Sequence, residues 1–171
     1  GRMDVLINNA SIFSTIKMQP FDEISDEEWR RVIDVNITGA FICSKAASAP
    51  MKQANWGRII NISSAAVNMG RANYLHYVTS KAGLIGMTRA MARELGKNGI
   101  TVNAILPGAT QTEIERETVS KAQFAAMVAM RAIPRGETPD DLVGIAAFLA
   151  SDDSAFFTGQ CMTVDGGLTH L

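Results

Sequence analysis

Four short apolar runs punctuate this chain, and between them lie longer stretches in which apolar residues recur every three or four positions. The short runs are largely continuous rather than alternating, which is typical of strands buried on both faces of a parallel sheet. The longer stretches have the periodicity of helices. This order of elements predicts an α/β fold. The expected strands are residues 5–9, 58–63, 101–106 and 161–164.

The first expected helix follows strand 5–9. Ser25 and Glu28 form the S-x-x-E pattern of a capping box, so the helix should begin at Ser25 and end at about Pro50 or soon after. One face of this helix should be buried against the sheet. Its predicted apolar stripe contains Trp29, Ile33, Ile37, Ala40 and Phe41.

Two more helices are expected, over residues 74–95 with Gly96 as the C-terminal cap, and after the pair Thr138 and Pro139. The segment 108–134 has weak periodicity. Two interpretations of it remain open: a partly helical lid over a site, or an ordinary pair of surface helices. Its apolar positions include Ile114, Phe124, Met127 and Met130.

The composition of the chain narrows its class. Its 171 residues are 47% hydrophobic and 19% charged, which fits one soluble globular domain. Sixteen basic and seventeen acidic residues leave a net charge of −1, so neither nucleic acid nor an anionic membrane is expected as a partner. Cys43 and Cys161 have neither disulfide-framework nor metal spacing, and no metal is expected. A cytoplasmic protein is therefore the expectation.

Four polar residues form the candidate catalytic set. Tyr77 and Lys81 are four residues apart on an expected helix, so their side chains share one face. Ser64 stands thirteen residues before Tyr77 at the end of a strand, and Asn36 stands twenty-eight residues before Ser64. Each has a structural alternative: a solvated pair for Tyr77 and Lys81, a strand end for Ser64, and a satisfied mid-helix polar residue for Asn36. Their coincidence favours catalysis.

In order and spacing, Asn36, Ser64, Tyr77 and Lys81 resemble the catalytic tetrad of the short-chain dehydrogenase/reductase family. The resemblance covers essentially the whole chain, and it implies a doubly wound parallel sheet of the Rossmann type. Matches to the family also flank the tetrad, in the segments 5–10, 101–108, 158–160 and 164–167. Within the family, the stretches 55–61, 76–107 and 148–167 look most like bacterial secondary-alcohol dehydrogenases of the phenylethanol type.

The resemblance implies a hydride transfer between NAD or NADP and a secondary alcohol or ketone. Tyr77 would exchange the hydroxyl proton, and the ammonium of Lys81 would favour the phenolate, whose reference pKa of about 10 is high for a base at neutral pH. Ser64 would orient the substrate oxygen by a hydrogen bond. Lys81 would also hold the nicotinamide ribose, and Asn36 would hold a water that links Lys81 to solvent.

The expected cofactor contacts follow two strands. Asn8, Ala10 and Ser11 would lie beneath the cofactor, although Asn8 is equally consistent with a bond between neighbouring strands. Ser11 stands where the family usually has glycine, and its side chain disfavours close backbone approach at that point. The remaining expected contacts, in addition to Tyr77 and Lys81, are Pro107, Gly108, Thr110 and Thr112.

None of the fourteen glycines forms the G-x-G-x-x-G phosphate turn of a dinucleotide fold. The resemblance therefore implies that residues 1–171 are a single partial dinucleotide-binding domain, incomplete at its N-terminus, with the first strands and the phosphate loop absent. This leaves open a non-catalytic truncated member that acts as a binding module. Intact mass together with a cofactor titration would separate that alternative from an enzyme.

The substrate and the assembly are also expectations. Apolar residues at 109–130, together with Val67 and Met69, predict a hydrophobic small-molecule substrate. A 3-ketoacyl-carrier-protein reductase is the alternative, which a basic docking patch would support, although solvated charges also explain the basic residues concerned. The resemblance further implies a homo-oligomer, a tetramer or dimer. The candidates for the basic patch are Arg116, Lys121, Arg131 and Arg135.

Overall fold

The computed structural model describes residues 2–113 and 120–170, and its centre is a four-stranded sheet. The strands lie in the order β1-β2-β3-β4, and all neighbouring pairs are parallel. The doubly wound parallel α/β fold expected from the sequence is therefore confirmed, and each strand lies within one residue of its expected bounds. The strands are β1 (Val5–Asn8), β2 (Gly57–Ile62), β3 (Ile100–Pro107) and β4 (Cys161–Val164).

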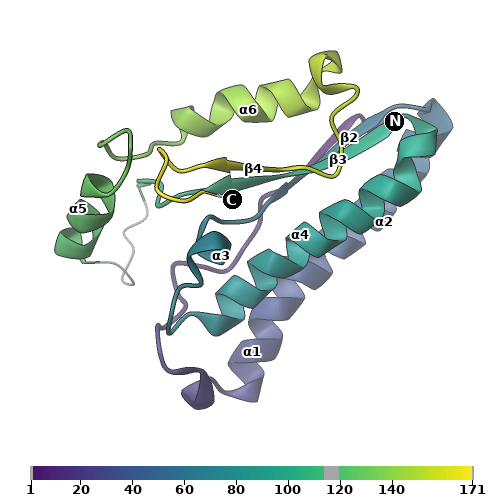
Figure 1. The fold of residues 1–171 in the computed structure, drawn as a ribbon. Coiled ribbons are helices and arrows are strands. Elements are labelled where there is room, and N and C mark those ends of the chain that lie inside the picture. The colour runs from purple at the N-terminus through teal and green to yellow at the C-terminus, as the bar shows by residue number, and fades with distance from the viewer. Residues whose placement is uncertain (1, 114–119, 171) are drawn as a thin grey trace.

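Helices cover both faces of the sheet. Figure 1 shows α2 (Gly39–Ala54) and α4 (Leu75–Leu95) on one face and α6 (Asp140–Ala150) on the other. α4 packs on β2 and β3, α2 packs on β1 and β2, and α6 packs on β2 and β3 from the opposite side. The remaining helical elements are α1 (Asp26–Ile33), a π-helix (Asp34–Thr38), α3 (Ala66–Met69), α5 (Lys121–Ala129) and the 3-10 turns Phe21–Glu23, Gly96–Asn98 and Asp152–Ser154.

Burial differs between the central and outer strands. β2 and β3 are buried almost throughout, as their continuous apolar sequences predict. β1 and β4 are only half-buried, and Ile7 in β1 is 46% exposed. The prediction of full burial is therefore wrong for these two strands, because each pairs with a single neighbour among the described residues.

The first long helix is interrupted by the π-helix, which the periodicity did not predict. A π turn adds one residue per turn and so displaces the buried face. Ala40 is buried as expected, whereas Phe41 is 52% exposed and its predicted burial is wrong. The expected positions Trp29, Ile33 and Ile37 are half-buried, and the observed stripe is Val32, Asn36, Ala40, Ser44, Ala47 and Met51.

All three predicted helix caps differ from their expected forms. Ser25 Oγ accepts the N–H of Glu28 at 3.2 Å as expected, but the Glu28 carboxylate accepts from Gln19 Nε2 at 2.9 Å instead of completing a capping box. Gly96 keeps a right-handed helical conformation, and the left-handed turn comes at Gly99, with φ of 69°. The expected side-chain cap at Thr138 does not form, because the Thr138 N–H and hydroxyl both donate to the Asp141 carboxylate and the N-cap position is Pro139, without a side-chain cap.

The segment 108–134 contains one described helix, α5, which begins with a complete capping box between Ser120 and Gln123. Ile114 and Arg116, named in the sequence predictions, lie outside the described residues. Within the described part of the chain, no helix combines the length and the apolar character that a membrane span requires.

Candidate active site

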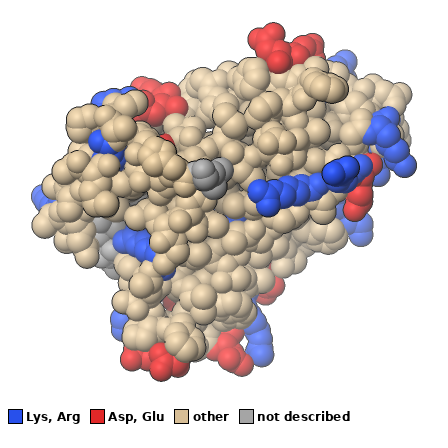
Figure 2. Space-filling view, viewed as in Figure 1, with Lys and Arg blue, Asp and Glu red and all other residues tan. Residues whose placement is uncertain are grey.

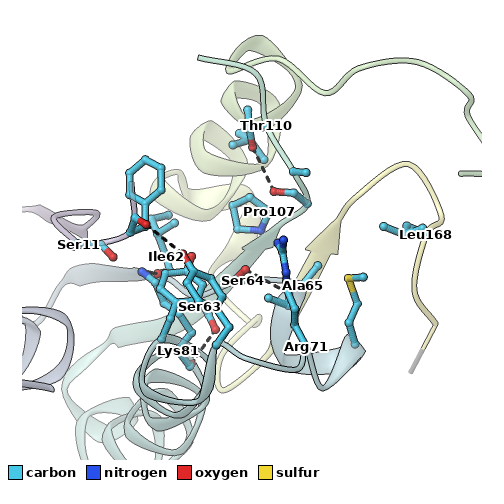
Figure 3. A pocket seen from close by; sticks show the side chains of 18 of the residues that line it. Ser11, Ile62, Ser63, Ser64, Ala65, Arg71, Lys81, Pro107, Thr110 and Leu168 are labelled. Atoms are coloured by element: carbon cyan, nitrogen blue, oxygen red, sulfur yellow. Dashed lines mark hydrogen bonds between the residues drawn. The ribbon is translucent and has the colours of Figure 1, made fainter. Parts of the chain in front are cut away.

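A cavity of about 440 Å³ opens beyond the carboxyl ends of β2 and β3, where ligands bind in open parallel sheets. Ser64, Tyr77 and Lys81 all line it, and Figure 3 shows Ser64 and Lys81 in this lining. The fold thus brings together three of the four candidate catalytic residues. The other described residues that line the cavity are Asn9, Ser11, Phe13, Ile62, Ser63, Ala65, Ala66, Met69, Arg71, Tyr74, Pro107, Gly108, Ala109, Thr110, Thr112, Met127, Pro139, Leu142 and Leu168.

Ser64 is held by the turn that follows β2. The N–H of Ser63 donates to the Ile105 carbonyl at 2.8 Å, and the Ser63 hydroxyl donates to the Lys81 carbonyl at 2.7 Å. These bonds tie the turn to both β3 and α4. Ser64 Oγ accepts the N–H of Ala66 at 3.2 Å, which fixes the oxygen while its O–H can be donated to a substrate oxygen.

Tyr77 and Lys81 project from the first turns of α4 toward the same space. Lys81 is 3% exposed, and its Nζ donates to the Ile62 carbonyl at 2.8 Å and lies 5.7 Å from the centre of the Tyr77 ring. Burial lowers the pKa of Lys81 to about 8. The group is therefore mainly an ammonium at neutral pH, and its field favours a phenolate at Tyr77.

Asn36 lies in the π-helix, behind the cavity rather than in its lining. Its Oδ1 accepts the Ile12 N–H at 2.8 Å, and its Nδ2 donates to the Ile12 carbonyl at 3.2 Å and to Ser80 Oγ at 3.0 Å. The Ser80 hydroxyl in turn donates to the Tyr77 carbonyl at 2.7 Å. Asn36 therefore joins the chain after β1 to the turn of α4 that carries Tyr77 and Lys81.

Asn8 and Ala10 lie apart from the lining residues. Asn8 Nδ2 donates to Asn61 Oδ1 at 2.8 Å and to Ser44 Oγ at 2.9 Å, so the bond between neighbouring strands forms as the alternative interpretation expected. Asn61 Nδ2 continues this network to Thr88 Oγ1 at 2.8 Å. Ala10 is exposed. The neighbouring Asn9, which the sequence predictions did not include, lines the cavity instead.

The other expected cofactor contacts all reach the cavity: Ser11, Pro107, Gly108, Thr110 and Thr112. A Cβ added at Gly108 would stand 2.5 Å from Glu137 Oε2 and 2.9 Å from Asp165 Cβ, so only glycine fits this tight approach. Hydroxyls and the Lys81 ammonium supply donors for ribose and amide oxygens. These features fit the nicotinamide half of a dinucleotide.

Several lining residues could not be predicted from spacing. Arg71 lines the cavity from the loop before α4, and its guanidinium carbon lies 5.5 Å from the Tyr74 ring centre. Figure 3 shows Leu168 on the C-terminal loop, far in sequence from Ser64. That loop is held by Asp165, which accepts the N–H groups of Gly167, Leu168 and Thr169 at 2.9 to 3.1 Å.

The predicted apolar wall is present only in part. Ala109, Met127 and Met69 line the cavity, whereas Met130 is 72% exposed and points to solvent. Of the four candidates for a basic patch, Arg131 is 5% exposed and ion-paired with Glu137, so its assignment to a surface patch is wrong. Figure 2 shows acidic and basic side chains in small groups over the face in view rather than in a continuous basic surface.

Comparisons with known proteins show the family to which the chain belongs. A family model described as Enoyl-(Acyl carrier protein) reductase matches residues 1–169. A subunit of (2S)-((R)-hydroxy(phenyl)methyl)succinyl-CoA dehydrogenase from Thauera aromatica is 41% identical over 98% of the chain. The 3-oxoacyl-acyl-carrier-protein reductase of Escherichia coli (strain K12) is 37% identical over 98% of the chain. The chain belongs to the short-chain dehydrogenase/reductase family.

Solved structures carry the same fold. The structure of a 4-hydroxyisoleucine dehydrogenase complexed with NADH superposes with a TM-score of 0.86 at 35% identity, and the match covers 97% of this chain and 69% of that one. The chain spans 65% of the length of the Thauera relative and 67% of that of the Escherichia relative.

Proposed function

We propose that this protein transfers a hydride between NAD or NADP and a secondary alcohol or ketone with hydrophobic substituents. The observation that carries the proposal is the meeting of Ser64, Tyr77 and Lys81 in one cavity at the carboxyl ends of the strands. A bound nicotinamide ring would accept or supply the hydride. The NADH in the related 4-hydroxyisoleucine dehydrogenase structure supports this cofactor class.

The protein residues would manage the proton and the orientation of the substrate. In the oxidative direction, Ser64 donates a hydrogen bond to the substrate oxygen, and the Tyr77 phenolate accepts the proton of the substrate hydroxyl. Lys81 stabilises the phenolate by charge. Because an ammonium has three N–H donors, Lys81 can hold the Ile62 carbonyl and still donate to a ribose hydroxyl.

Asn36 is proposed to act indirectly, by holding the segments that carry the site residues. Its bonds to Ile12 and Ser80 support a role in holding the start of α4 in place. The resemblance adds a bound water between Lys81 and solvent, and this role is part of the same proposal. Tyr77 and Lys81, with Ser11, Pro107, Gly108, Thr110 and Thr112, are the residues proposed to contact the cofactor.

The lining of the cavity supports a hydrophobic substrate. Most of its side chains are apolar, and the Thauera relative is named for a secondary alcohol that carries a phenyl group. The names of the 3-oxoacyl-acyl-carrier-protein reductases at 35 to 39% identity favour a second candidate, the reduction of a 3-ketoacyl thioester. A non-catalytic binding module agrees less well with the structure, because it gives no reason for Ser64, Tyr77 and Lys81 to share one cavity.

A substrate panel tests the proposal. The protein is assayed with both cofactors against aryl and alkyl secondary alcohols, their ketones, polyols and a 3-ketoacyl thioester. We expect the aryl and alkyl compounds to have the highest kcat/KM. Polyols that outperform them would contradict the hydrophobic substrate class, and a preferred thioester would favour the second candidate. A protein of the correct intact mass that binds neither cofactor would support the binding module.

A further inference from the structure

A buried ion pair holds the loop that follows β3. Glu137 is 4% exposed, and each of its carboxylate oxygens accepts a hydrogen bond from this loop. Oε2 accepts the N–H of Gly108 at 3.1 Å, and Oε1 accepts the hydroxyl of Thr110 at 2.7 Å. The backbone carbonyl of Glu137 accepts the N–H of Gln111 at 2.7 Å. One residue thus contacts three of the four positions from Gly108 to Gln111.

Arg131 holds Ala109, the one position between Gly108 and Gln111 that Glu137 does not contact. Its Nη2 donates to the Ala109 carbonyl at 3.2 Å and lies 3.6 Å from Glu137 Oε2, and its Nη1 donates to the Arg135 carbonyl at 2.8 Å. Arg131 Nε is buried without a hydrogen-bond partner among the described residues. A buried ion pair is often no more stabilising than a well-packed apolar pair. Stability alone therefore does not explain why charges occupy these positions.

The loop lies directly against this carboxylate and at the rim of the cavity. The short distance from a hypothetical Gly108 Cβ to Glu137 Oε2 leaves no space between backbone and carboxylate. Figure 3 shows Thr110 beside Pro107 at the cavity. Burial raises the pKa of Glu137, while the Thr110 hydrogen bond and the charge of Arg131 act in the opposite direction. The carboxylate is thus removed from water and directed at the loop.

We propose that Glu137 is a positioning residue, which with Arg131 fixes the backbone of residues 108–111 in the geometry that receives the nicotinamide end of the cofactor. The inference rests on the proposed function. Glu137 reaches the cofactor only through the loop, so its loss should loosen that loop and weaken cofactor binding. Ser64, Tyr77 and Lys81 belong to other elements and should keep their arrangement.

The test uses three variants of the protein. Glu137→Gln keeps the shape but replaces one acceptor oxygen by a donor NH₂ and leaves Arg131 without a counter-charge. The double variant Glu137→Leu with Arg131→Met removes both charges and can restore packing. Asp141→Asn is the matched control, because it weakens the nearby but more exposed ion pair with Arg135.

Two readouts are compared: amide hydrogen exchange of residues 108–111 without cofactor, and the Kd for NADH and NADPH. In Glu137→Gln and in the double variant, we expect exchange at least tenfold faster and a Kd at least tenfold higher, with Asp141→Asn near wild type. Urea denaturation gives the unfolding free energy of each variant, and a double variant with the wild-type unfolding free energy but a raised Kd supports positioning. The inference is overturned if folded Glu137→Gln matches wild type in both readouts, or if the double variant restores both. Wild-type protein that binds neither cofactor would instead overturn the proposed function.

Discussion

Lys81 Nζ lies 5.7 Å from the centre of the Tyr77 ring, one helical turn along α4, and is anchored to the Ile62 carbonyl at the end of β2. A strand end and a helix thus fix the position of one positive charge beside one phenol. The Lys81 charge is nearly excluded from water, and this burial costs folding free energy. The charge itself favours the phenolate form of Tyr77. Stability and proposed catalysis are therefore opposed at Lys81.

This opposition predicts that Lys81→Met stabilises the fold at pH 7. The pKa of Lys81 is about 8 in the folded protein against 10.5 for the ordinary side chain. Each pKa unit corresponds to about 1.4 kcal/mol, and the lost bond to Ile62 offsets part of the gain, so we expect an increase in unfolding free energy on the order of 2 kcal/mol. Turnover should fall sharply in the same variant.

The difference in unfolding free energy between Lys81→Met and wild type should change with pH in a definite direction. Between pH 8 and 10.5 the unfolded chain holds a proton at Lys81 that the folded protein has lost, so the stability of wild type rises with pH. Urea titrations should therefore show the advantage of Lys81→Met shrinking over that range. The exposed Lys97→Met is the control and should change stability little. An advantage that grows with pH would contradict the account.

We expect the small buried hydrogen-bond network through Asn61 to contribute strongly to the unfolding free energy of the protein. Asn61 is fully buried and bonds both Asn8 and Thr88. Asn61→Leu leaves these partners with unmet hydrogen bonds, so we expect a loss of about 2 kcal/mol in unfolding free energy, measured by urea denaturation.

Thr101 provides the matched comparison on the adjacent strand. Its hydroxyl is buried without a hydrogen-bond partner among the described residues. Thr101→Val removes an unsatisfied polar group at nearly constant shape and should be neutral or stabilising by up to about 1 kcal/mol. Equal losses in Asn61→Leu and Thr101→Val would show that burial alone, rather than the network, sets the cost.

Exposed apolar side chains on α2 support the expected self-association. Phe41 and Ile42 are 52% and 58% exposed on the outer side of this helix. We expect light scattering at micromolar concentration to show a homo-oligomer, and Phe41→Glu to reduce its mass. Val143→Glu, at another exposed apolar position on α6, is the control. A wild-type protein that is only monomeric would contradict this prediction.

Much of the fold could be predicted because local pattern and global order agree. Continuous apolar runs located the strands to within a residue. The spacing of Ser64, Tyr77 and Lys81 predicted a common site, and the three residues line one cavity. Phe41 was misplaced because a π turn leaves no mark in the spacing of apolar residues. Ordinary helical periodicity carries no information about such an inserted residue.

The rest of the site depends on contacts between distant segments. Arg131 resembles a surface cation in sequence, and only folding brings it to Glu137 and buries both. Leu168 and Arg71 enter the cavity from a C-terminal loop and from the loop before α4, without any periodic signal. For Asn8 the sequence allowed two interpretations, because a strand-end amide can form hydrogen bonds with either a neighbouring strand or a ligand.

The most direct test of the account compares two tyrosines on neighbouring positions of the site. The rings of Tyr74 and Tyr77 stack with centres 4.6 Å apart, but Tyr74 is buried and its hydroxyl donates to the Phe13 carbonyl at 3.0 Å. Each Tyr→Phe change removes one oxygen and keeps the ring. The measurement is kcat for both folded variants with the best substrate of the panel.

We expect Tyr77→Phe to lower kcat by roughly 10² to 10⁴, the range for loss of a positioned acid or base, with little change in cofactor Kd. Tyr74→Phe should lower kcat less than tenfold. If Tyr74→Phe abolished turnover while Tyr77→Phe remained near wild type, the assignment of Tyr77 as the proton-transfer group and the mechanism built on it would be wrong.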